Sequence, residues 1–154
     1  MKILGIDYGD IRIGISISDD SQKIALPLKT IVKKDENTIK PAIAELKEII
    51  KINDIEKIVL GNPLNMNGTK GIRAIKTEDF KERLHRNFKK IEIILWDERL
   101  TSIQAENILK EMNSQDAWAS SKRSLRPARE KSAVDQIAAT LILQTFLDKE
   151  NNGK

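Results

Sequence analysis

The side chains of this sequence that could do chemistry are carboxylates at the ends of apolar stretches. Asp7 closes the apolar stretch 3–6, and Asp97 and Glu98 follow a second one at 91–96. Apolar runs of this kind are typical of strands buried in a covered sheet. A carboxylate at such a position must be paired, hydrogen-bonded or bound to a metal. These two strand ends are therefore candidate functional positions.

Asp7 also has an ordinary structural interpretation. Asp favours turns beside glycine, and Gly9 follows it two residues later. Asp10 could fill that role equally well. An acid directly on a central strand is unusual, so the turn and the functional interpretation carry similar weight on local grounds.

Composition narrows the chemistry that these acids could do. The chain has 154 residues, no cysteine and one histidine, His85, which lies in a charged helical stretch where exposure to solvent is expected. Thiolate metal sites, cysteine nucleophiles and most Ser-His-Asp arrangements are therefore excluded. The apolar run at the start is too short for a signal peptide, and none is long enough to span a bilayer. We expect a cytoplasmic protein without a membrane partner.

The net charge of +4 is concentrated in one stretch. Residues 120–131 contain five basic side chains against Glu130 alone, so the rest of the chain is neutral. The basic side chains are Lys122, Arg123, Arg126, Arg129 and Lys131. We expect a loop that is either simply solvated or binds an anion.

Hydrophobic periodicity predicts the elements that position the acids. Residues 3–18 predict a hairpin, and 23–32 predict a third strand in which Pro27 requires a sheet edge. Apolar residues at helical spacing predict a helix over 36–53 and a second one from about 72 to 88. The residues of the second helix that are expected to face the core are Ile72, Ile75, Phe80, Leu84 and Phe88.

Strands are also expected over 57–61 and 91–96, with a polar loop at 62–69. A third helix is expected near Thr101, where 101–104 has the form of a capping box. A last helix is expected over about 132–147. The polar tail 148–154 is expected to fray, and no domain boundary is visible, so we predict one domain over 1–147.

This order of elements predicts an α/β fold with a five-stranded mixed sheet, three antiparallel strands followed by two parallel ones, and helices on both faces. Right-handed crossovers would bring the ends of the parallel strands to one edge, where open α/β sheets bind ligands. Asp7, Asn62 and the pair Asp97-Glu98 would meet there. Because side chains alternate along a strand, only one member of the pair is expected to join Asp7.

The last helix supplies a third acid, Asp135. A polar stripe of Gln136, Thr140 and Gln144 is expected to face solvent, and Asp135 lies off that stripe. It stacks instead in a row with Ala139, Ile142 and Phe146. Asp135 is also three residues after Ser132, so a capping-box role carries about the same weight.

Three converging carboxylates without cysteine or a useful histidine favour a hard divalent cation, Mg²⁺ or Mn²⁺. Two such ions can align an attacking water and stabilise the leaving oxygen in a displacement at phosphorus. The basic stretch immediately before Asp135 would then hold a polyanionic substrate beside the acids.

Four segments of the chain resemble motifs of the YqgF family, small bacterial RNase H-like proteins described as pre-16S rRNA nucleases or Holliday junction resolvases. The segments are Gly5-Ile6-Asp7-Tyr8-Gly9 with Arg12-Ile13-Gly14, Gly61 to Thr69, Asp97 to Ser102, and Val134 to Ala139. The resemblance runs in order and spacing from residue 1 to about 147.

The resemblance implies an RNase H-like fold and a metal-dependent nuclease whose acids are Asp7, Glu98 and Asp135, with Asp97 as the alternative to Glu98. It further implies Mg²⁺ or Mn²⁺ as cofactor. The expected substrate is precursor rRNA at the 5′ end of 16S, or alternatively branched DNA, and the expected state is a monomer or homodimer.

Basic residues would bind nucleic acid, namely Lys122, Arg123, Arg126 and Arg129. The loop that contains Asn62, Asn65 and Asn67 would contact substrate. The family's second motif usually reads Gly-Leu-Pro where this chain has Gly61-Asn62-Pro63. This departure changes the polarity of the loop but affects none of the acids.

Two other classes fit parts of the sequence. Asp7, Gly9 and Gly14 also resemble the phosphate loop of actin-like and sugar-kinase ATPases, which need two such domains where this chain has length for one. A noncatalytic RNA-binding module is the other alternative. Aromatic residues make up only 4% of the chain, too few for a stacking platform, and buried acids would repel phosphate unless a metal neutralised them.

Overall fold

The computed structural model describes residues 1–65, 67–98 and 126–153, and side chains within the last segment from 132 onward. The elements in chain order are β1 (Lys2–Tyr8), β2 (Arg12–Ser18), β3 (Ala25–Val32), α1 (Lys40–Asn53), β4 (Ile55–Asn62), α2 (Ile72–Asn87), β5 (Glu92–Asp97) and α5 (Arg126–Asn152). The helix predicted near Thr101 lies outside the described residues, as do Lys122 and Arg123.

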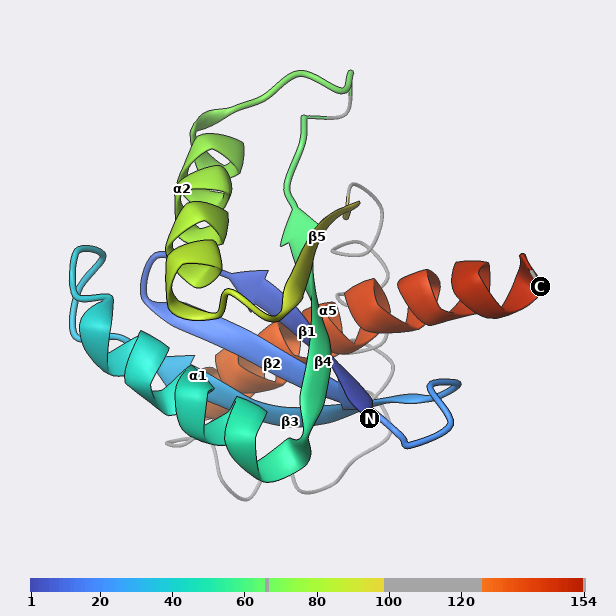
Figure 1. The fold of residues 1–154 in the computed structure, drawn as a ribbon. Helices are drawn as coiled ribbons and strands as arrows, with labels where there is room; N and C mark the ends of the chain where they lie inside the picture. The colour runs from blue at the N-terminus through green and yellow to red at the C-terminus, as the bar shows by residue number, and fades with distance from the viewer. Residues whose placement is uncertain (66, 99–125, 154) are drawn as a thin grey trace.

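The strands form one mixed sheet in the order β3-β2-β1-β4-β5. β2 is antiparallel to both β1 and β3, whereas β1, β4 and β5 run parallel. Figure 1 shows α1 and α2 on one face of this sheet and α5 across the other. The predicted fold class is confirmed. Pro27 lies in β3 at a sheet edge, as expected of a residue that cannot donate to a ladder.

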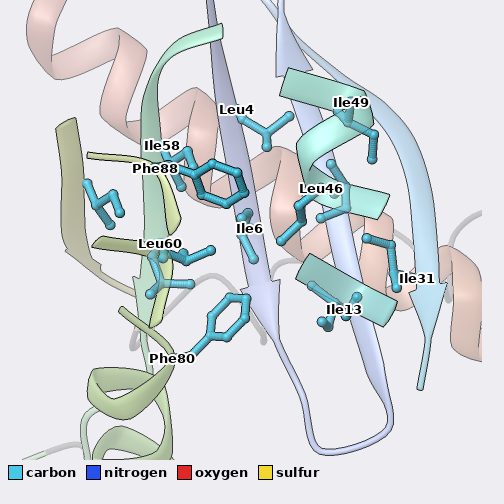
Figure 2. Packing of buried hydrophobic residues seen from close by; sticks show 14 of the residues in the cluster. Leu4, Ile6, Ile13, Ile31, Leu46, Ile49, Ile58, Leu60, Phe80 and Phe88 are labelled. Atoms are coloured by element: carbon cyan, nitrogen blue, oxygen red, sulfur yellow. The ribbon is translucent and has the colours of Figure 1, made fainter. Parts of the chain in front are cut away.

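The face under α1 and α2 holds the larger apolar core. Leu4 and Ile6 of β1 and Ile13 of β2 are fully buried there against Leu46 of α1 and Phe80 of α2. Figure 2 shows these side chains between the sheet and the two helices. Dense aliphatic packing of this kind fixes how the strands twist and align.

The opposite face packs on α5 through smaller side chains and fewer apolar ones. Ile3 and Val59 contact Ile142, Leu143 and other apolar residues of the helix. A Cβ on Gly5 would lie 2.8 Å from that of Leu143. The Ser16 hydroxyl donates a hydrogen bond of 2.7 Å to the Ala139 carbonyl oxygen. The glycine and this bond show that α5 lies unusually close to the sheet.

The start of α2 differs from the sequence prediction. Ile72 and Ile75 are exposed, while Ala74 and Thr77 take the inward positions. Thr77 is buried without cost because its hydroxyl donates to the Arg73 carbonyl oxygen at 2.8 Å. The predicted inward positions of the second half, Phe80, Leu84 and Phe88, are confirmed. His85 is exposed, as expected.

Helix α5 is longer than predicted, since it begins at Arg126 and runs to Asn152. Arg126 and Arg129 therefore lie on the helix rather than in a loop, and much of the tail expected to fray is helical. Asp135 lies well inside the helix, so its capping-box role is wrong. Ser132 donates instead to the Thr30 hydroxyl of β3 at 3.0 Å.

The prediction that the polar stripe of α5 faces solvent is wrong. The stripe is half-buried and packs along β3. Gln144 accepts a hydrogen bond from the Ala25 amide at 2.8 Å and donates to the Lys23 carbonyl. Gln136 donates to the Thr30 hydroxyl. The two bonds of Gln144 satisfy backbone groups at the sheet edge, and that of Gln136 reaches a side chain of β3, so a polar stripe suits this interface.

Candidate active site

Asp7 lies near the carboxyl end of β1, on the face of the sheet covered by α5. Side chains alternate along a strand, so Asp7 points to the same side as Ile3 and Gly5, which contact α5. Tyr8 points the other way and stacks on Phe80 of α2 with ring centroids 4.1 Å apart. The acid is therefore directed at the helix that carries Asp135.

Gly14 pairs with Asp7 across the β1-β2 ladder and makes room for Asp135. A Cβ at Gly14 would overlap the carbonyl oxygen of Asp135 and lie 3.1 Å from its Cβ. The backbone of α5 therefore rests directly on β2 at this point. This close approach brings Asp135 to the strand pair that holds Asp7.

Gly61 has the same role for Glu98. Near the end of β4, a Cβ on this glycine would overlap the Glu98 carboxylate and lie 2.5 Å from Ile142 of α5. The Glu98 carboxylate therefore lies on the α5 face, and the residue is only 5% exposed. Asp97 is exposed. Of the pair Asp97-Glu98, it is Glu98 that lies on the same face of the sheet as Asp7. This agrees with the expectation that only one of the two would turn toward Asp7.

The electrostatics of Asp7 and Glu98 show that the two carboxylates are close. Burial raises the pKa of Asp7 to about 6, with a smaller contribution from the charge of Asp135 and an opposing one from Arg73. Burial, and then the charge of Asp7, raises the pKa of Glu98 to about 8. Two buried acids that disfavour each other's ionisation form a site suited to a cation.

Asp135 is held by a cation from the sheet. Arg12 of β2 donates from Nε to Asp135 Oδ2 at 2.8 Å, and the two side chains are 37% and 17% exposed. Burial raises the pKa of Asp135, while the hydrogen bond and charge of Arg12 oppose that rise. Arg12 thus fixes the carboxylate in position near the edge where β1 ends.

A cavity of about 340 Å³ opens beside Glu98. It is lined by the loop after β4 and the first residues of α2, namely Pro63, Leu64, Asn65, Gly71, Ile72, Arg73 and Glu98. The Arg73 side chain lowers the pKa of both Asp7 and Glu98 through its charge. The cavity and this guanidinium therefore belong to the same edge of the sheet as the acids.

The polar loop after β4 is ordered by its own side chains. Asn65 Nδ2 donates to the Thr69 hydroxyl at 3.0 Å, and Asn67 Oδ1 accepts from the Thr69 amide at 3.1 Å. Gly68 has a φ of 85°, which glycine adopts without strain. Asn62 Oδ1 is buried and has no hydrogen-bond partner within the described part of the chain. By alternation Asn62 faces away from Glu98.

The sequence analysis gave no role in a nuclease site to four residues that shape it, Arg12, Gly14, Gly61 and Arg73. Both glycines lie in segments that resembled the family motifs, but what each contacts across the sheet depends on tertiary packing. A signal for Arg12 was its place in the same motif as Asp7. Arg73 carried no signal in the sequence.

The described residues include no ready-made group of three or more His, Asp or Glu side chains arranged to hold a metal ion. Asp7 and Glu98 interact electrostatically, and so do Asp7 and Asp135, whereas Arg12 binds Asp135 directly. The acids therefore lie near one another without forming a complete coordination shell.

No described helix is long and apolar enough to cross a membrane.

The sheet order, together with acids gathered where β1 and β5 end under the last helix, defines an RNase H-like protein. In agreement, the fold is similar to that of "T. thermophilus RuvC in complex with Holliday junction substrate", with a TM-score of 0.54 at 15% identity over 92% of this chain and 91% of that one. A family model described as "RuvX: Holliday junction resolvase" matches residues 1–149, and the chain belongs to this family.

Relatives of similar length support the same assignment. The chain is 41% identical over 149 residues to "Putative pre-16S rRNA nuclease" of Ruminiclostridium cellulolyticum, covering 97% of this chain and 95% of the relative. It is 41% identical over 152 residues to the protein of the same name from Thermoanaerobacter pseudethanolicus, covering 99% of each. The resemblance to the YqgF family is confirmed.

Proposed function

We propose that this protein is a metal-dependent nuclease that hydrolyses phosphodiester bonds in the 5′-end processing of pre-16S rRNA. The convergence of Asp7, Glu98 and Asp135 on the α5 face of the sheet carries the proposal, because three acids from distant parts of the chain meet at one edge. The names of the relatives supply the substrate. Such a role would be exercised in the cytoplasm, during ribosome biogenesis.

The donor set fits a hard divalent cation. Oxygen ligands alone suit Mg²⁺ or Mn²⁺, and Asp7 and Glu98 disfavour each other's charge until a cation compensates them. Asp7, Glu98 and Asp135 would hold the metal, which we propose is a pair of ions. When bound, such ions lower the pKa of an attacking water and neutralise charge on the leaving oxygen.

The chain's own residues prepare this site in three ways. Gly14 and Gly61 let the helix backbone and the Glu98 carboxylate lie against the sheet. Arg12 orients Asp135 through a charged hydrogen bond of 2.8 Å. Burial raises the pKa of Asp7 to about 6 and that of Glu98 to about 8, so a cation that binds here displaces the protons that remain on them.

Substrate binding is proposed for the basic residues and the loop after β4. Lys122, Arg123, Arg126 and Arg129 precede Asp135 in the chain, so phosphates held by them would lie next to the acids. Asn62 is the last residue of β4 and faces away from Glu98, whereas Asn65 and Asn67 lie in the loop that follows, and Asn65 lines the cavity beside Glu98. Branched DNA is the second candidate substrate, favoured by the description of the family.

The experiment that tests this function is cleavage of a pre-16S rRNA fragment and of a four-way DNA junction in Mg²⁺ and in Mn²⁺. Asp7→Asn removes a charge at nearly constant shape, so cleavage should fall by orders of magnitude while the fold is kept. Glu98→Gln should behave alike, and the exposed Asp97→Asn should cost much less.

Asp10→Asn is the matched control for Asp7→Asn. Asp10 is an exposed acid of the same hairpin, and it pairs with Lys76 of α2 rather than with the site. It should leave cleavage unchanged. Nucleic-acid binding without cleavage by the wild-type protein would favour the noncatalytic module, and cleavage of the junction alone would favour the resolvase.

A further inference from the structure

The cavity beside Glu98 belongs to the candidate active site, because Glu98 itself is one of its lining residues. Its floor and walls come from the loop residues Pro63 to Asn65, from the start of α2 and from Glu98 itself. At about 340 Å³ it is near the lower end of pockets that hold small molecules, about 300–1,000 Å³. It has room for one nucleotide unit, and whatever fills it must lie directly beside a site carboxylate.

Among the described residues that line this cavity, Arg73 is the one with a positive charge. It belongs to the first turn of α2, which contains no acidic residue. Two other basic residues in this part of the chain are engaged elsewhere, because Lys70 forms an ion pair with Glu78 and Lys76 forms ion pairs with Asp10 and Glu36. The charge of Arg73 instead acts on Asp7 and Glu98.

Phosphate is the ligand that this combination fits best. A guanidinium presents paired donors that match two phosphate oxygens, and such charge-assisted pairs are among the strongest hydrogen bonds in proteins. The wall residues Pro63, Leu64 and Ile72 add apolar surface suited to a sugar. Among its described lining residues the cavity thus offers one guanidinium and several apolar groups, beside the Glu98 carboxylate, whose repulsion of phosphate a bound cation would offset.

Resting on the proposed nuclease function, we propose that this cavity binds the nucleotide adjacent to the scissile phosphate and that Arg73 grips its phosphate. This contact sets the register of the strand against Asp7 and Glu98. Arg73 is then a substrate-binding residue with no part in proton transfer. It acts equally on RNA and DNA, because a backbone contact carries no base information.

Arg73→Ala tests the assignment by binding measured with Mg²⁺ in the Asp7→Asn background, in which cleavage is expected to be lost, over a series of salt concentrations. The probes are a single-stranded RNA fragment of the pre-16S 5′ region and a four-way DNA junction. A hydrogen bond to a charged group contributes about 1.5–3 kcal/mol, so affinity for the bound probe should fall about tenfold to 150-fold. The slope of log affinity against log salt should fall by about 0.7–0.9.

Arg83→Ala is the matched control. Arg83 is an exposed arginine of the same helix, ten residues further on and about 15 Å along the axis, and it lines a different cavity. It should leave affinity and slope unchanged. Arg73→Lys keeps the charge but not the paired donors, so it should retain the salt slope and lose part of the affinity. In the otherwise wild-type protein with Mg²⁺ present, Arg73→Ala should raise KM more than it lowers kcat.

Arg73→Ala with wild-type affinity and slope would overturn the assignment, and so would an equal loss in Arg83→Ala or a wild-type protein that binds neither probe. A merely structural Arg73 would change thermal stability but not the salt slope. The proposed nuclease function fails separately. If the wild-type protein binds through Arg73 but cleaves nothing, the cavity is a binding site without a nuclease. If it cleaves while Arg73→Ala binds normally, the nuclease stands and this inference is wrong.

Discussion

The two faces of the sheet are built from different kinds of residue. Under α1 and α2, the strands present Leu4, Ile6 and Ile13, large side chains that are fully buried. Under α5, the same strands present Gly5, Gly14 and a serine that bonds to the helix backbone. One face is a core that excludes water. The other face carries small side chains, which let the α5 backbone lie close to the strands.

This difference separates stability from function along individual strands. Ile13 and Gly14 are neighbours in β2, but one fills the core and the other lies under Asp135. Burying carboxylates is costly, so the α5 face would weaken the fold if the opposite face did not compensate. The comparison predicts that adjacent substitutions in one strand give opposite phenotypes.

The largest effect on stability is expected for Ile13→Ala on the core face. Removal of a fully buried isoleucine side chain costs about 2–5 kcal/mol, through lost burial and the cavity that remains. Chemical denaturation measures this cost. Cleavage per folded molecule should stay near the wild-type value, since Ile13 lies in the core on the face opposite the acids. A loss of cleavage as large as that of Asp7→Asn would show that the two faces are not separate.

Gly14→Ala is expected to cost less stability, about 1–3 kcal/mol, but most of the activity. The added Cβ overlaps a backbone oxygen of α5, so the helix must shift and Asp135 must move with it. The readouts are the denaturation midpoint and cleavage at matched folded fraction. If Gly14→Ala proves as active as the wild type, the close approach of α5 does not position the acid.

The third effect is a dependence of stability on pH in metal-free protein. Burial raises the pKa of Asp7 to about 6 and that of Glu98 to about 8, above their ordinary values of 3.8 and 4.5. Between about pH 4 and 8 the folded state therefore binds more protons than the unfolded state, and these two acids make stability fall as pH rises.

Melting temperatures in EDTA between pH 4 and 8 measure this dependence. The double variant Asp7→Asn with Glu98→Gln should flatten the curve, whereas Asp10→Asn should not. Mg²⁺ or Mn²⁺ at a hundredfold excess over its dissociation constant should add about 2.7 kcal/mol by mass action, most visibly at pH 8. A wild-type curve that matches the double variant's would contradict buried, mutually repelling acids.

Local sequence patterns determined most of the architecture. Alternation and apolar runs predicted the five strands, Pro27 predicted the edge position of β3, and the order of elements predicted the parallel strand ends that meet at Asp7, Asn62 and Asp97. Asp7 and Glu98 were visible as charges at the ends of buried strands, and Asp135 as an acid off the polar stripe of the last helix. These features depend on short segments of sequence, so they can be predicted without knowing which other segments they contact.

Tertiary packing decided what those segments do to each other. Helical periodicity alone turned the stripe of Gln136, Thr140 and Gln144 toward solvent, but the unpaired backbone of β3 makes it an interface. The same holds for Arg73, whose role depends on a loop and an acid distant in sequence. Hydrogen-bond partners, close glycine contacts and pKa shifts are set by atoms brought together only on folding, and therefore no local pattern encodes them.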